Sequence, residues 1–167
     1  MSIARHILVA TDFSELDEAA IGMAGELAQS LAAKLTVLHV HGHPPEPPEA
    51  VVPPERLVWS SDLDTEALQA LQELKIAKLA NVESIDLVTV EDGMPAHAIY
   101  KYASNHGIDL IVLGSHERTG LAHFFFSSVP EKVVKHAPCA VLVVPPSKRQ
   151  QSEHEESQKE AAVQAVH

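Results

Sequence analysis

The sequence has one cysteine, few aromatic residues and no long apolar run, and each shortage excludes a class of protein. Cys139 alone cannot form an internal disulfide, and aromatic residues, at 4%, are too few to stack along single-stranded nucleic acid. No apolar run approaches the roughly 18 residues that a membrane span requires. The segment 1–5 lacks the pattern of a secretory signal. We therefore expect a protein of the reducing cytoplasm.

Basic residues are scarce as well. The chain has 12 Lys and Arg against 23 Asp and Glu, which gives a formal net charge of -11. Binding to a nucleic-acid backbone or to an anionic membrane depends on Lys and Arg. The composition therefore argues against both, and we expect no nucleic-acid partner and no membrane partner.

Three common motifs of nucleotide-binding proteins and hydrolases are missing. The sequence contains no Gly-x-Gly-x-x-Gly fingerprint, no Gly-x-x-x-x-Gly-Lys-Ser/Thr loop and no Gly-x-Ser-x-Gly turn. Cys139 follows a proline at the start of an apolar run, where a buried, inert thiol is favoured over a nucleophile. No residue is therefore predicted to be catalytic.

Five short apolar runs are what the sequence does contain, and such runs are typical of strands in a parallel sheet. They occupy residues 6–10, 35–40, 85–90, 110–114 and 140–144. The third run alternates in polarity, as on a half-exposed edge. Apolar residues at helical spacing lie between the runs, along 16–31, 63–77, 96–103 and 129–134. This alternation predicts an α/β domain over residues 1–146, an open, doubly wound, Rossmann-like sheet with helices on both faces.

Two segments depart from this pattern. Residues 41–61 hold six of the 11 prolines, between Pro44 and Pro54, and are predicted to be an extended loop inserted into the domain. The polar segment 147–167 is predicted to be a disordered or loosely helical tail.

The carboxyl ends of the predicted strands are the place to look for a ligand, because open α/β sheets bind ligands at that edge. This rule selects Ala10, Thr11 and Asp12, then Val40 with His41, then Gly114 with Ser115 and His116. Asp12 has two interpretations: it caps the following helix, or it accepts hydrogen bonds from ribose hydroxyls.

The sequence leaves the role of two further groups of residues undecided. His39, His41 and His43 alternate along an extended segment, so their side chains share one face, and they either hold a metal such as zinc or simply pack. Ser115 lies beside His116, but adjacency in sequence does not make a catalytic pair. A binding or loop role is the favoured interpretation of that pair.

Five stretches together resemble the universal stress protein family over residues 5–145: 7–14, 37–40, 93–95, 109–116 and 128–144. The resemblance implies a sheet of strand order 3-2-1-4-5. It also implies a homodimer joined through the last strand, Ala140–Val144. Many members of that family bind ATP or another adenine nucleotide through a Gly-x2-Gly-x9-Gly-Ser/Thr loop after the fourth strand.

The resemblance also assigns roles to single residues. Asp12 matches the ribose contact, Val40 the position whose backbone meets adenine, and Gly114 and Ser128 the first glycine and closing serine of the loop. Two matches fail, because Glu117 and Ser127 stand where the second and third glycines belong, and Gly120 does not restore the motif. The predicted binding site comprises Ala10, Thr11, Asp12, Val40, Gly114, Ser115, His116, Glu117, Gly120, Ser127, Ser128 and Val129.

The sequence thus predicts a dimeric, cytoplasmic stress-response protein that binds an adenine nucleotide. Glu117 places a negative charge in the phosphate loop, so ATP is expected to bind weakly and AMP or a cyclic mononucleotide relatively better. No metal is expected beyond Mg²⁺ carried by the nucleotide. One alternative is a slow ATPase that uses Ser115 or Ser128. Another is an interaction protein that binds no nucleotide and meets an unidentified protein partner through the Pro-rich loop and the tail.

Overall fold

The structure is a computed structural model that describes residues 4–42, 60–115 and 129–147, with only the backbone described at 60–63. Most of the predicted Pro-rich loop and tail lie outside the described residues. So does the segment 116–128 that follows the fourth strand. Within the described part of the chain, no helix combines the length and apolarity that crossing a bilayer requires.

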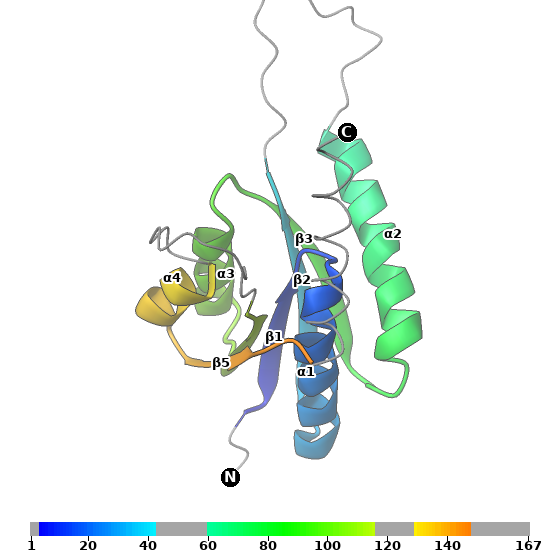
Figure 1. Ribbon diagram of the computed structural model, residues 1–167, viewed down its shortest axis with the longest axis vertical. Helices are drawn as coiled ribbons and strands as arrows, with labels where there is room; N and C mark the ends of the chain where they lie inside the picture. Colours follow the sequence, from blue (N-terminus) through cyan, green and yellow to red (C-terminus); the bar gives the residue numbers. More distant parts are fainter. Residues whose placement is uncertain (1–3, 43–59, 116–128, 148–167) are drawn as a thin grey trace, which may run out of the picture.

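Five parallel strands form one sheet of order β3-β2-β1-β4-β5 (Figure 1). They are β1 (His6–Thr11), β2 (Lys34–His41), β3 (Ile85–Glu91), β4 (Leu110–Gly114) and β5 (Ala140–Val144). Three strands are longer by one or two residues than the apolar runs that predicted them, and the order confirms the predicted topology. The order reverses between β1 and β4, because the chain runs outward from β1 to β3 and then returns to the other side of β1.

Helices cover both faces of this sheet, with α1 and α2 on one side and α3 and α4 on the other (Figure 1). Their bounds are α1 (Glu18–Leu31), α2 (Ser60–Lys78), α3 (Pro95–Asn105) and α4 (Val129–His136). A short 3₁₀ turn, η1 (Glu15–Asp17), precedes α1 and holds Leu16, the first residue of the predicted apolar stripe. The doubly wound α/β architecture is therefore confirmed.

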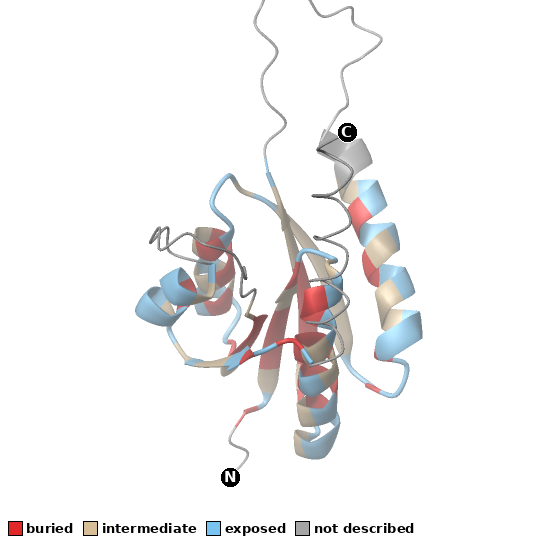
Figure 2. Ribbon diagram, in the orientation of Figure 1, coloured by how far each residue is buried: buried red, intermediate tan, exposed pale blue. Residues whose placement is uncertain are grey.

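The central strand β1 explains why its sequence is apolar without alternation. Ile7, Leu8 and Val9 have no exposed surface, because Ile7 and Val9 pack under α1 and α2 while Leu8 packs under α3 and α4. Figure 2 shows that buried residues gather in the middle of the sheet and on the helix faces turned toward it. Each such side chain contributes about 1.5–3 kcal/mol of burial free energy. β3 lies at the sheet edge and is only half-buried, which is why its sequence alternates.

Candidate functional site

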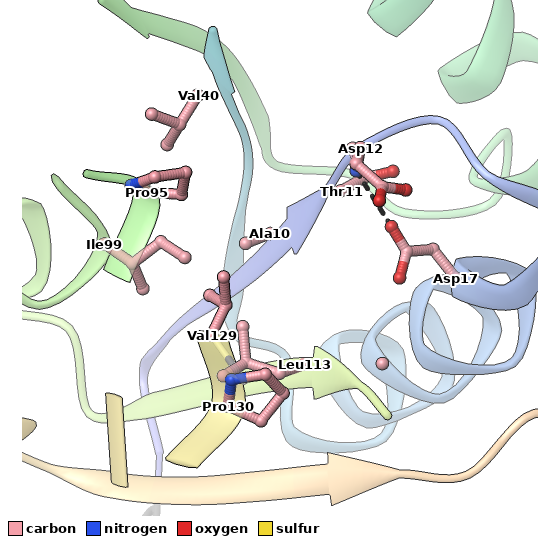
Figure 3. A pocket seen from close by; sticks show the side chains of 11 residues that line it. Ala10, Thr11, Asp12, Asp17, Val40, Pro95, Ile99, Leu113, Val129 and Pro130 are labelled. Atoms are coloured by element: carbon pink, nitrogen blue, oxygen red, sulfur yellow. Dashed lines mark hydrogen bonds between the residues drawn. The ribbon is translucent and has the colours of Figure 1, made fainter. Parts of the chain in front are cut away.

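A cavity of about 190 Å³ opens at the switch point, where the carboxyl ends of β1, β2 and β4 meet the starts of α3 and α4 (Figure 3). It is lined by Ala10, Thr11, Asp12, Asp17, Val40, Pro95, Ile99, Leu113, Gly114, Val129 and Pro130. Six predicted site residues are therefore brought together here: Ala10, Thr11, Asp12, Val40, Gly114 and Val129. Small-molecule sites usually hold 300–1,000 Å³, so this space suits a single ring system with part of a sugar.

Of the other six predicted site residues, only Ser115 lies within the described structure. Ser115 is not among the lining residues, and its backbone N–H donates to the carbonyl of Val144 at 2.9 Å, which extends the β4–β5 pairing. Its predicted part in the site is therefore not seen. The remaining five lie outside the described residues: His116, Glu117, Gly120, Ser127 and Ser128.

Among the described lining residues, Asp12 and Asp17 are acidic and most of the others are apolar. Val40, Ile99 and Leu113 belong to the apolar cluster beneath α3 and α4 and present hydrocarbon to the cavity (Figure 3). Asp12 and Asp17 stand together on the opposite side. Among the described lining residues there is no Lys, Arg or His. The arrangement favours a flat apolar ring that carries hydrogen-bond donors near Asp12.

The turn after β1 is held by side-chain oxygens on three consecutive backbone amides. The N–H of Asp12 donates to Oδ2 of Asp17 at 2.8 Å, that of Phe13 to Oγ1 of Thr11 at 3.0 Å, and that of Ser14 to Oδ1 of Asp12 at 2.9 Å. Phe13 has φ of 65°, in the left-handed region that non-glycine residues rarely adopt. The three bonds stabilise this turn and leave the side chain of Asp12 exposed at the cavity rim.

These contacts bear on the two interpretations of Asp12. Its carboxylate accepts from the amide two residues along the chain, which is a local turn ahead of η1. The residue at the N-cap of η1 is Ser14, so Asp12 does not occupy the capping position. Asp12 therefore shapes the turn while it faces the cavity.

Asp17 is the site residue that sequence reasoning missed. Its side chain is buried, with 3% exposed, and its carboxylate lies between Asp12 and Gly114. The sequence shows only an acidic residue near a helix start, where capping is the ordinary interpretation. Pro95, Ile99, Leu113 and Pro130 also line the cavity and were not predicted as site residues, although Pro95, Leu113 and Pro130 lie within stretches that carry the family resemblance.

The histidines of β2 pack against other elements. The Nδ1–H of His39 donates a hydrogen bond to the carbonyl of Thr11 at 2.9 Å, and the rings of Phe13 and His39 lie 4.4 Å apart between centroids. Nε2 of His41 is bonded to Oδ1 of Asp64 at 2.8 Å. The hydrogen bonds that Asp64 accepts from His41 and Thr89 lower the pKa of its carboxyl. Within the described ranges no group of three or more His, Cys, Asp or Glu side chains could hold a metal, and His43 lies outside them.

Cys139 is half-buried at the start of β5. Burial raises the pKa of its thiol, so the reactive thiolate is disfavoured at neutral pH. This direction favours the interpretation of Cys139 as an inert thiol.

Comparison with known proteins gives one consistent family. The model of the universal stress protein family matches residues 4–145. Universal stress protein YxiE of Bacillus subtilis is 32% identical over 151 residues, which cover 83% of this chain and 97% of that protein. The structure of universal stress protein UspA from Lactobacillus plantarum has a TM-score of 0.62 at 33% identity, covering 83% and 96% of the two chains. A universal stress protein solved in complex with cAMP shares the fold, with a TM-score of 0.61 at 23% identity over 86% and 98% of the two chains.

Proposed function

The chain belongs to the universal stress protein family, and we propose that it is a cytoplasmic stress-response protein whose switch-point cavity binds an adenine mononucleotide. The observation that carries the proposal is the pairing of an apolar cavity with the carboxylate of Asp12 at its rim. The complex of a family member with cAMP supports the same class of ligand.

The described residues suit the nucleoside part of such a ligand. The adenine ring packs between Val40 and Ile99, where apolar side chains exclude water from its faces. The ribose hydroxyls donate hydrogen bonds to Asp12, and a charged acceptor makes such bonds stronger than neutral ones. Neither role needs a metal. Any Mg²⁺ enters with the phosphates of the nucleotide.

Charge disfavours a triphosphate at this site. The cavity wall already carries Asp12 and Asp17, and Glu117 follows β4 in the sequence. Two unit charges about 4 Å apart repel by roughly 4 kcal/mol at an effective dielectric constant near 20. A residual of only about 1.4 kcal/mol weakens binding tenfold. We therefore propose that AMP or a cyclic mononucleotide binds more tightly than ATP.

The proposed assembly is a homodimer through β5. This strand is the last of the sheet, and Val143 on it is 37% exposed. An unpaired apolar edge is a liability that proteins cover, and in a twofold dimer the strand covers itself.

Calorimetry with AMP, cAMP and ATP tests the proposed ligand. Asp12→Ala should weaken all three, since the ribose contact is common to them, whereas Glu117→Gly should strengthen ATP most. Asp86→Ala is the matched control, because its carboxylate pairs with Lys34 at the opposite end of the sheet. Tighter binding of ATP than of AMP by wild type, with no effect of Glu117→Gly, would refute the charge argument. No binding of any nucleotide would leave the interaction-only alternative.

A further inference from the structure

Asp17 occupies the N-cap position of α1, yet its side chain makes no capping hydrogen bond. An aspartate in that position usually accepts a hydrogen bond from an amide of the first helical turn. Here the carboxylate turns back along the chain, and its Oδ2 accepts the N–H of Asp12 at 2.8 Å (Figure 3). The contact links the start of α1 to the residue proposed to hold the ribose.

Gly114 makes room for this carboxylate. A Cβ atom on Gly114 would overlap Oδ1 of Asp17 and would lie 3.5 Å from its Cα and Cγ atoms. Among the described residues the positive-φ glycine is Gly107, so the backbone conformation at Gly114 does not call for glycine. The need for glycine at this position is therefore one of space. The atoms nearest to that space belong to Asp17.

We infer that Asp17 is a positioning residue of the nucleotide site, and that Gly114 is required because it admits the Asp17 carboxylate. This inference rests on the proposed function. The family resemblance gives the first loop glycine a different task, close approach of the backbone to phosphate. The two tasks predict different results when Asp17 is removed.

The positioning acts through the turn after β1. Without the Asp17 carboxylate, the Asp12 amide loses its acceptor, and the turn that holds Phe13 in the left-handed region loses one of its three side-chain bonds. The side chain of Asp12 then samples orientations away from the cavity. Nucleotide affinity falls although Asp12 itself is intact.

A double-mutant cycle tests the inference, with AMP as the probe and calorimetric Kd as the readout. Asp17→Ala should weaken AMP binding about tenfold, the loss expected when one charged hydrogen bond no longer orients the contact. Asp17→Asn keeps an oxygen acceptor for the Asp12 amide and should restore most of the affinity. Gly114→Ala should weaken binding in the wild-type background and cause little further loss in the Asp17→Ala background.

Two results would overturn the inference. Equal losses from Gly114→Ala in both backgrounds would assign the glycine to phosphate approach. Unchanged AMP affinity in Asp17→Ala would remove the positioning role. Asp86→Ala again controls for the loss of a carboxylate.

Failure of the proposed function gives a separate signature. If wild type binds no AMP, the nucleotide site and the positioning role both fall. The contact between Asp17 and Gly114 is then judged on unliganded protein, from coupling of the same two substitutions in Tm and from the NMR shift of the Asp12 amide in Asp17→Ala. Additive changes in Tm and an unmoved amide resonance would refute the contact as well.

Discussion

Gly22 and Gly25 lie about one turn apart in α1, and replacement by alanine should stabilise the protein at Gly22 but not at Gly25. Both substitutions remove the same conformational freedom from the unfolded chain, which favours folding by about 0.5–1 kcal/mol in a helix interior. They differ in what the new methyl group meets. A Cβ on Gly22 would have no atom within 4 Å, whereas a Cβ on Gly25 would lie 2.7 Å from Cδ2 of Leu79.

The size of the difference follows from the packing around Leu79. This side chain is 2% exposed and belongs to the core cluster beneath α1 and α2, so it has little room to move. Overpacking a core costs about 1–3 kcal/mol. Gly22→Ala should therefore stabilise by about 0.5–1 kcal/mol, and Gly25→Ala should be neutral or destabilising by up to about 2 kcal/mol.

Urea and thermal unfolding measure both changes. At about 2–4 °C per kcal/mol for a chain of this size, Gly22→Ala should raise Tm by about 1–4 °C. Leu79→Val removes the atom that would clash, so Gly25→Ala should become stabilising in that background. Equal stabilisation by both alanines in the wild-type background would mean that Leu79 moves aside at no cost, and the packing argument would be wrong.

Three further predictions concern assembly, acid stability and the core. Val143→Lys should convert a β5-mediated dimer to a monomer, as measured by light scattering, and an unchanged mass would place the interface elsewhere. Val143 is exposed and is a better probe than Val141, which packs beneath α3 and α4. Asp109 accepts the amides of Arg5 at 2.8 Å and His6 at 3.0 Å, and these bonds lower the pKa of its carboxyl. Its stabilisation is therefore complete above the usual pKa of about 4 and is lost as pH falls through the lowered value. In Asp109→Asn, the free energy of unfolding in urea should therefore fall less steeply below about pH 4 than in wild type. The same pH dependence in both proteins would contradict this. Leu71→Ala should lower the free energy of unfolding by about 2–5 kcal/mol, because Leu71 is fully buried. Leu68→Ala, at an exposed position, should lower it by less than about 0.5 kcal/mol, and similar losses at both positions would contradict the burial.

The sheet could be predicted because each buried strand has a distinct composition. β1 and β4 lie inside the sheet and are covered on both faces, so they read as continuous apolar runs. β3 lies at the edge and is only partly buried, so its sequence mixes polar with apolar residues. The strand order came from the family resemblance, since apolar runs by themselves do not say which strands are neighbours.

The site was predictable where it follows from strand ends and not where it follows from helix packing. Asp12, Val40 and Gly114 come directly from the rule on carboxyl ends. Ile99 lines the cavity because α3 packs over the sheet, and no local pattern encodes that packing. Asp17 could not be predicted, because an aspartate at a helix N-cap is common, whereas its contact with the Asp12 amide is not the usual capping bond.

The role of the β2 histidines could not be predicted from the sequence either. The alternation of His39 and His41 correctly places them on one face of β2. Their hydrogen-bond partners, Thr11 and Asp64, are 28 and 23 residues away in the sequence. Metal ligation and packing therefore look alike until the neighbouring elements are in place.

The central place of β1 has a consequence for synthesis of the chain. Its residues pair on one side with β2, where Ile7 meets Leu35, and on the other with β4, where Ile7 meets Leu110. A ribosome that adds about 5–20 residues per second needs about 5–20 s to make the roughly 100 residues between β1 and β4. Throughout that time one edge of the central strand has no partner, and unpaired edges pair readily with other chains. A nascent chain stalled after β3 therefore presents an aggregation-prone edge as a result of strand order alone.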